Sequence, residues 1–135
     1  MITVYLALGT NLGDKYLNLS IAKELIAERI GNLSAISSIV ESEPWGYESN
    51  NSFCNMALEV QTELSPEELL NKTQEIEIEM GRTSKSTNST YQDRIIDIDI
   101  ILYGDISYKS DRLEIPHPLY KERPFVMIPL QEILK

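Results

Sequence analysis

The chain lacks the features that several protein classes require. Cys54 is its single cysteine, which excludes an internal disulfide framework and fits a reducing compartment. No apolar run approaches the roughly 20 residues that cross a bilayer, and the N-terminus has no basic region followed by an apolar one. We therefore expect a cytoplasmic protein with no membrane segment. Its 135 residues are enough for a single domain, 1–135, with its own core.

Basic residues are also scarce, and the formal net charge is −9. This argues against DNA or RNA as the main partner, because nucleic-acid binding needs a basic surface. The charge is unevenly distributed: residues 1–80 hold four basic and thirteen acidic side chains, whereas residues 81–135 hold eight of each. A basic cluster in this second part would suit a small polyanion such as a nucleotide. Its members are Arg82, Lys85, Arg94, Arg112, Lys121 and Arg123.

Residues 94–104 predict a central strand that two carboxylates interrupt. Five isoleucines and a leucine in this stretch suit a buried, pleated surface. Period-2 alternation places Asp97 and Asp99 on one face, with Cα atoms roughly 7 Å apart. The opposite face would be lined by Ile96, Ile98, Ile100 and Leu102.

These two carboxylates need a compensating charge, since an unpaired ion beside a core costs several kcal/mol. One interpretation is an ion pair with Arg94 or another arginine. The other is a divalent hard cation, because adjacent carboxylates with no Cys or His nearby favour Mg²⁺ or Mn²⁺ over zinc. Mg²⁺ usually takes one or two protein carboxylates and completes its shell with water and phosphate oxygens, so this alternative indicates a phosphate-handling site.

The hydrophobic patterns along the chain predict an α+β fold. Strands are expected at 3–8, 33–40, 53–60 and 94–104, and helices at 15–29 and from the Ser65 cap to Gly81, with a hairpin after Gly104 and a short helix at 128–134. The order is that of a ferredoxin-like βαββαβ sandwich: an antiparallel sheet with helices on one face and the other face free for a ligand. The polar stretch 82–93 has no apolar period and leads into the Asp strand, which favours a lid.

Two features are more often structural when they are taken alone. The turn with Gly9 and Gly13 lacks the Lys-Ser/Thr of a phosphate-binding loop. His117 is the lone histidine and lies between two prolines, in an extended and rigid segment.

Several short motifs run in order along the whole chain. They are Leu8-Gly-Thr-Asn-Leu-Gly-Asp14, Pro44-Trp-Gly46, Phe53-Cys-Asn55, Gln74-Glu-Ile-Glu77, Gly81-Arg82, Arg94-Ile-Ile-Asp97-Ile-Asp99, Ile115-Pro-His117 and Arg123-Pro-Phe125. Each is weak alone, but in this order and spacing the chain resembles the 6-hydroxymethyl-7,8-dihydropterin pyrophosphokinases of folate biosynthesis. The resemblance implies a ferredoxin-like enzyme that uses two Mg²⁺ ions. Such an enzyme moves a pyrophosphoryl group from ATP to the pterin hydroxymethyl group and releases AMP.

The resemblance also implies a role for each matching residue. Asp97 and Asp99 would hold both metals, and Arg82 and Arg94 would complete the catalytic set by neutralising the phosphates. ATP would be bound by Gln74, Glu77, Arg82, Arg94, the backbone near Ile100, Arg112, His117 and Arg123. The pterin would be bound by Ser42, Pro44, Trp45, Phe53, Asn55 and Phe125, with the two phenylalanines sandwiching the ring and the asparagine contacting its amide edge.

Three positions depart from the family pattern. Ser84 and Tyr91 stand where the lid often has arginine and tryptophan, and Pro118 stands where tyrosine often follows the histidine. Each concerns a nucleotide contact rather than the reaction. The partners expected are ATP and a reduced pterin, with no nucleic acid and no membrane, and the protein is expected to be a monomer.

A non-catalytic ferredoxin-like domain that binds a regulatory small molecule is the alternative of another class. Such a domain needs neither paired acids on its open sheet face nor an arginine-flanked lid. Mg²⁺-dependent ATP turnover would separate the two.

Overall fold

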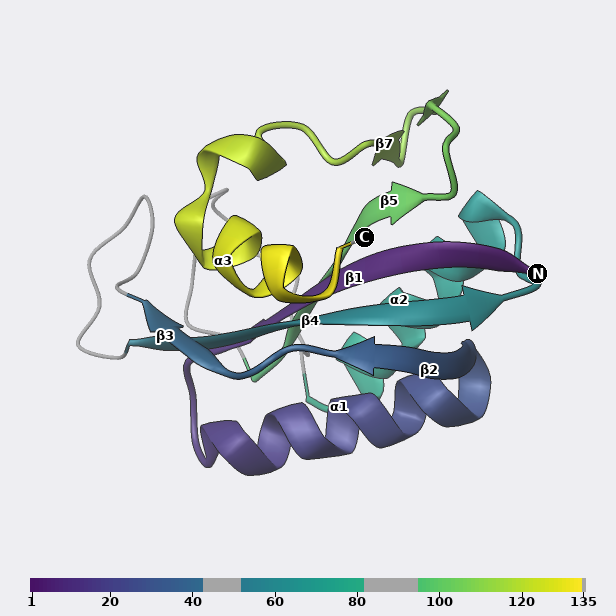
Figure 1. Ribbon diagram of the computed structural model, residues 1–135. Coiled ribbons are helices and arrows are strands. Elements are labelled where there is room, and N and C mark those ends of the chain that lie inside the picture. Colours follow the sequence, from purple (N-terminus) through teal and green to yellow (C-terminus); the bar gives the residue numbers. More distant parts are fainter. Residues whose placement is uncertain (43–51, 82–94, 135) are drawn as a thin grey trace.

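A computed structural model describes residues 1–42, 52–81 and 95–134, and the structural statements below concern these residues (Figure 1). One antiparallel sheet forms the centre of the molecule. The elements in chain order are β1 (Ile2–Thr10), α1 (Lys15–Arg29), β2 (Gly31–Ile36), β3 (Val40–Ser42), β4 (Phe53–Thr62), α2 (Pro66–Glu79), β5 (Asp97–Tyr103), β6 (Tyr108–Lys109), β7 (Glu114–Ile115), the 3₁₀ turn η1 (Tyr120–Glu122) and α3 (Pro124–Ile133).

The strands are ordered β2-β4-β1-β5, and β3 also pairs with β4. β1 lies between β4 and β5 and is antiparallel to both. β5, which carries the aspartates, therefore lies at one edge of this sheet. The predicted ferredoxin-like, antiparallel arrangement is confirmed.

Local capping signals set the starts of the two crossover helices. Asp14 accepts a hydrogen bond from the Leu17 backbone N–H (3.1 Å) at the start of α1. Ser65 and Glu68 form a reciprocal capping box around Pro66 at the start of α2, with distances of 3.2 and 2.9 Å. A cap of this kind contributes about 1 kcal/mol. Both helices begin where these signals predicted.

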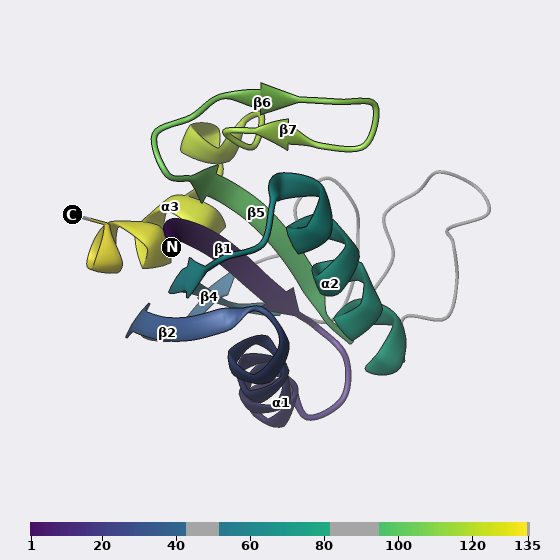
Figure 2. The ribbon, with the colours of Figure 1, turned by 90° about the vertical axis from the view of Figure 1, so that its right-hand side faces the viewer.

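The sheet has a core on each face. On the face of α1 and α2, the first core contains the strand residues Val4, Leu6, Leu8, Met56, Leu58, Val60, Ile98 and Ile100, and Ile96 just before β5. On the opposite face, the second core packs α3 against the residues Tyr5, Ala7, Ala57 and Ile101. Figure 2 shows α1 and α2 on one side of the sheet and α3 on the other. The expectation that this second face is wholly free for a ligand is therefore wrong, because α3 covers part of it.

The C-terminal helix and the strand predicted at 33–40 differ from the structure. α3 begins at Pro124 rather than near residue 128, with proline in its first turn. The predicted strand 33–40 is divided into β2 and β3. Ser37 marks the break: its N–H donates to the Ala57 carbonyl (3.0 Å) and its Oγ accepts from the Ala57 N–H (2.8 Å).

A register shift in β5 changes the face of Leu102. Ile100 pairs with Leu6, but Leu102 pairs with Tyr5, so Ile101 is an extra residue opposite the Tyr5–Leu6 step. Leu102 consequently packs against the second core rather than beside Ile100 as predicted.

Over the described residues, no helix has the length and apolar character needed to cross a membrane.

Candidate active site

Asp97 and Asp99 lie on β5 and are both half-buried. Their neighbours Ile96, Ile98 and Ile100 belong to the first core, so the two carboxylates are on the opposite face, the side of α3. The predicted shared face is thus confirmed. Arg94, the proposed ion-pair partner, lies outside the described residues, as does Arg82. The ion pair and the metal site both stay predictions.

One row across the sheet joins the predicted metal side to the predicted pterin side. Gly9 on β1 pairs with Asn55 on β4 and with Asp97 on β5. Residues directly opposite one another share a face, and two strand spacings separate Asn55 from Asp97 by about 10 Å. The next row is Ala57, Ala7 and Asp99.

Small residues make the floor between these two ends. A Cβ atom on Gly9 would lie 3.2 Å from Asn55 Oδ1 and 3.5 Å from Phe53 Cδ1, so a larger residue would crowd both side chains. Gly9 was predicted only as part of a turn, so this role was missed. The available signal was the alternation of Ala7 and Gly9 along one face of a strand.

Asn55 is held by β3 on the pterin side. It is 4% exposed, and its Nδ2 donates to the Val40 carbonyl (3.1 Å) and to Ser42 Oγ (2.8 Å). Phe53 begins β4, and Phe125 lies in the first turn of α3 and packs against the second core. The Arg123 guanidinium carbon is 6.0 Å from the Phe125 ring centroid. The structure thus brings Ser42, Phe53, Asn55 and Phe125 to one side of the sheet, while Pro44 and Trp45 lie outside the described residues.

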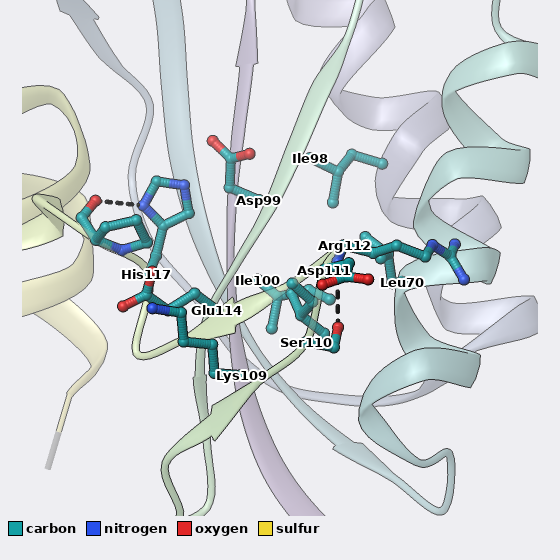
Figure 3. A pocket seen from close by; sticks show the side chains of 12 residues that line it. Leu70, Ile98, Asp99, Ile100, Lys109, Ser110, Asp111, Arg112, Glu114 and His117 are labelled. Carbon is teal, nitrogen blue, oxygen red and sulfur yellow. Dashed lines mark hydrogen bonds between the residues drawn. The ribbon is translucent and has the colours of Figure 1, made fainter.

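A groove of about 370 Å³ lies beyond the edge of β5 (Figure 3). Its lining comes from α2, β5, the hairpin of β6 and β7, and the segment after β7. The predicted residues Asp99, Ile100, Arg112 and His117 all line it, and so does Pro118, one of the departures from the family pattern. In Figure 3, His117 and Arg112 lie on either side of Ile100.

Arg112 and Gln74 meet beside this groove. Arg112 Nη2 donates to Asn71 Oδ1 (2.6 Å) and to Gln74 Oε1 (3.3 Å). Glu77, unlike Gln74, is bonded to β5: it is 6% exposed, and its carboxylate accepts from the Ile98 backbone N–H at 2.7 Å. Glu77 therefore holds the outer edge of the aspartate strand. Its spacing from Gln74 showed that the two share a helix face, but could not show this bond to a strand 21 residues away.

His117 is fixed to the same strand. Its backbone N–H donates to the Ile101 carbonyl (3.0 Å), and its Nδ1 lies 2.7 Å from the Pro118 carbonyl. Burial lowers the pKa of His117 below its usual 6.5, and Arg123 lowers it further, against opposing effects of the Pro118 carbonyl and Asp97. The imidazole is therefore mostly neutral at pH 7 in the ligand-free protein.

Ser84 and Tyr91, the other two departures from the family pattern, lie with the predicted lid outside the described residues.

Residues 5–135 match the family model described as 7,8-dihydro-6-hydroxymethylpterin-pyrophosphokinase (HPPK). The chain belongs to the HPPK family. This confirms the predicted family and supports the interpretation as a pyrophosphokinase over that of a regulatory domain.

Individual relatives of the HPPK family agree along nearly the whole chain. A Porphyromonas gingivalis protein named 2-amino-4-hydroxy-6-hydroxymethyldihydropteridine pyrophosphokinase is 46% identical over 134 residues, which cover 98% of this chain and 91% of that protein. A Bacillus subtilis protein of the same name is 42% identical over 130 residues, covering 96% of this chain and 76% of that protein.

The fold matches solved HPPK-containing structures. Plasmodium falciparum HPPK-DHPS has a TM-score of 0.73 at 17% identity, over 99% of this chain and 40% of that one. A second HPPK-DHPS structure, in complex with substrates, gives 0.74 at 16% identity, over 98% of this chain and 40% of that one. These two similarities concern the fold alone.

Proposed function

We propose that the protein transfers the pyrophosphoryl group of MgATP to the hydroxymethyl group of 6-hydroxymethyl-7,8-dihydropterin and releases AMP. The observation that supports this most directly is the row Asn55, Gly9 and Asp97, which joins a polar ring-binding end to an acidic end across one strand. The second row brings Asp99 to the nucleotide groove. Family membership supplies the reaction class.

The groove beside β5 suits the nucleotide. Its volume of about 370 Å³ is within the range typical of small-molecule sites. Because β5 is an edge strand, alternate backbone groups point away from β1. Ile98 N–H takes this direction and meets Glu77, and Ile100, two residues on, presents its backbone toward the groove. Arg112 and Gln74 then lie on the α2 side and His117 on the other.

Asp97 and Asp99 fit the requirements of Mg²⁺. Two half-buried carboxylates on one strand face offer hard oxygen ligands, and Mg²⁺ commonly uses only one or two such groups together with phosphate oxygens. Asp97 and Asp99 would hold two ions. When bound, the ions neutralise phosphate oxygens and align an in-line displacement.

The pterin ring suits the opposite end of the row. Both N–H bonds of Asn55 Nδ2 go to β3, which leaves Oδ1 directed toward Gly9 as an acceptor for N–H groups of the ring edge. Phe53 and Phe125 would stack on the ring, and Ser42, Pro44 and Trp45 would complete the pocket. The hydroxymethyl group would then point along the row toward Asp97.

The remaining residues act on the transferred group. Arg82, Arg94 and Arg123 would bind phosphate oxygens through their planar guanidinium groups, and His117 would contact the phosphates from the groove. Stabilisation of the moving group by Arg82 and Arg94 is expected mainly in the transition state, so Arg82→Ala should lower kcat more than it weakens ATP binding. The rest of the rate acceleration is expected from positioning, which holds the pterin hydroxyl group in line with the β-phosphorus.

Product analysis tests this proposal. Purified protein is incubated with ATP, MgCl₂ and the reduced hydroxymethylpterin, and a single-turnover mixture is followed by phosphorus NMR. AMP and a pterin pyrophosphate should appear together, and omission of Mg²⁺ should prevent both. Accumulation of ADP in step with a pterin monophosphate would overturn the proposal.

We further propose that the protein works as a monomer in the cytoplasm. The single cysteine, Cys54, is fully buried, and burial is the first cause of its raised pKa, as expected of an inert structural thiol in a reducing compartment. Light scattering of the purified protein should give 15.4 kDa. A mass of twice that value would contradict the monomer.

A further inference from the structure

The hairpin of β6 and β7 supplies half of the nucleotide groove but has little structure of its own. Six of the twelve lining residues, 109–114, belong to it. Its ladder has only two residue pairs, Tyr108 with Ile115 and Lys109 with Glu114. A two-stranded ribbon of this size is not stable in isolation, so contacts with the rest of the molecule must fix its position.

Apolar packing fixes only the base of the hairpin. Ile115 is buried in the first core, and Tyr108 and Leu113 pack against it. The outer part, from Lys109 to Arg112, is mostly exposed. Figure 2 shows the hairpin beside the start of α2.

One carboxylate at the start of α2 binds this outer part. Glu67 Oε2 accepts from Tyr108 Oη and from Ser110 Oγ, each at 2.7 Å, and Glu67 Oε1 lies 3.3 Å from Arg112 Nη1. These bonds join residues 41 to 45 positions apart in the sequence. The same bonds, first those from Tyr108 and Ser110, lower the pKa of Glu67, so the carboxylate is charged at neutral pH.

Arg112 extends the contact along α2. Beyond Glu67, its Nη2 reaches Asn71 and Gln74, one and two turns further along the helix. The Arg112 backbone N–H also donates to Ser110 Oγ (3.2 Å), so the serine hydroxyl links the hairpin tip to the same carboxylate. The outer wall of the groove is therefore attached to α2 chiefly through Glu67.

We infer that Glu67 is a positioning residue for the nucleotide, because its carboxylate holds residues 108–112 where they close the groove and aim Arg112. This inference rests on the proposed use of the groove for ATP. Glu67 itself is not among the residues that line the groove. Its loss should therefore act on ATP affinity through the hairpin and leave the pterin side, across the sheet at Asn55, largely unchanged.

The test compares Glu67→Ala with Glu68→Ala. Both acids lie in the first turn of α2, so both variants lose the same interaction with the helix dipole, but the Glu68 carboxylate accepts from the Ser65 backbone N–H rather than from the hairpin. Glu67→Ala should raise KM for ATP roughly tenfold, the effect of losing charge-assisted hydrogen bonds, and change KM for the pterin less than about twofold. Glu68→Ala should leave both values near those of the parent. Tyr108→Phe removes one donor and should give a smaller shift of KM for ATP.

Amide hydrogen exchange of the ligand-free protein provides a second readout that does not depend on activity. Exchange in residues 108–114 should speed up in Glu67→Ala and not in Glu68→Ala. Unchanged exchange there, an equal rise of both KM values, or the same effect from Glu68→Ala would overturn the inference. If the parent protein makes no AMP at all, the proposed function fails, while the exchange measurement still decides whether Glu67 holds the hairpin.

Discussion

Gly9 has no side chain, so β1 does not crowd Asn55 in the row that runs to Asp97. An added methyl group would lie 3.2 Å from Asn55 Oδ1, close enough that the amide must move by a few tenths of an ångström. Because Asn55 is held on its other side by two bonds to β3, it has little room to move. The proposed ring site therefore depends on this glycine as well as on the side chains that would contact the ring.

Gly9→Ala should keep the fold and impair pterin binding selectively. Overpacking of this size costs about 1 kcal/mol of stability. KM for the pterin should rise roughly tenfold, the cost of a displaced hydrogen bond, whereas KM for ATP should stay within about twofold. Steady-state kinetics with each substrate varied in turn measures both. An unaltered KM for the pterin would show that the row across Gly9 does not bind the ring.

The pKa of His117 predicts how the stability of the folded protein depends on pH. Its pKa in the folded, ligand-free protein should be below 6.5, chiefly because of burial. The unfolded chain then binds the proton more readily, so stability is full above about pH 6.5 and falls as the pH drops through the folded-state pKa.

The measurement is simple because the chain has one histidine. NMR titration of the imidazole C–H signals gives the pKa, and urea unfolding from pH 7.5 to pH 5 gives the stability. His117→Asn should flatten the stability profile in this range. A titration midpoint at or above 6.5 would contradict the burial seen here.

Among the elements, those defined by neighbouring residues were predicted well. The bounds of α1 were predicted at 15–29 because Asp14 caps it and its apolar positions repeat with helical period. The Ser65 and Glu68 box placed the start of α2 in the same way. The partner strands of the sheet followed from the order of these elements.

Elements shaped by distant partners were not predicted well. The break between β2 and β3 depends on Ala57, and the bulge at Ile101 depends on the register with β1, neither of which local alternation reveals. Dependence on distant partners also explains which residues of the candidate site were identified from the sequence and which were not. Asn55 and the aspartates were identified because polar residues are unusual in a strand, whereas Glu67 looks like one more acid on an acidic helix until its partners 41 to 45 residues away are known.

The contact between α3 and the β2–β3 connection is expected to support pterin binding. Glu132 accepts from the Ser38 N–H (2.9 Å) and from Ser38 Oγ (2.5 Å), and β3, which follows, binds Asn55. Glu132→Ala should loosen β3 and weaken pterin binding roughly two- to fivefold, as expected for hydrogen bonds at an exposed site. Gln131→Ala, at an exposed neighbouring position, is the control. Equal pterin affinity in both variants, measured by calorimetry, would refute the link.

For the whole molecule, the metal proposal predicts how stability responds to ligands. A ligand that binds only the folded state at 100 times its Kd adds about 2.7 kcal/mol, which raises Tm by several degrees for a chain of this size. ATP with Mg²⁺ should produce this shift, and ATP with EDTA should produce little of it. Thermal unfolding followed by circular dichroism measures both.

Asp97→Asn separates a ligand role from a structural one. If Asp97 binds metal, the variant should lose the Mg²⁺-dependent shift while the ligand-free protein keeps its Tm or gains slightly, since repulsion between the carboxylates is relieved. If the variant instead unfolds at markedly lower temperature in metal-free buffer, the aspartate belongs to a structural ion pair.

β1 contributes no charged side chain to the row that it centres, yet it determines the dimensions of the proposed active site. The distance from Asn55 to Asp97 equals two interstrand spacings, and backbone hydrogen bonds fix each of them at about 4.8 Å. In the proposed site, substitutions on β4 or β5 would alter which ring or which charge is bound, but they would not bring the two ends closer together. Acceptor molecules should accordingly be selected by the distance between ring and hydroxyl group. A hydroxyl group one carbon nearer to the ring, or two carbons further away, would not reach the phosphorus even if the ring itself bound normally.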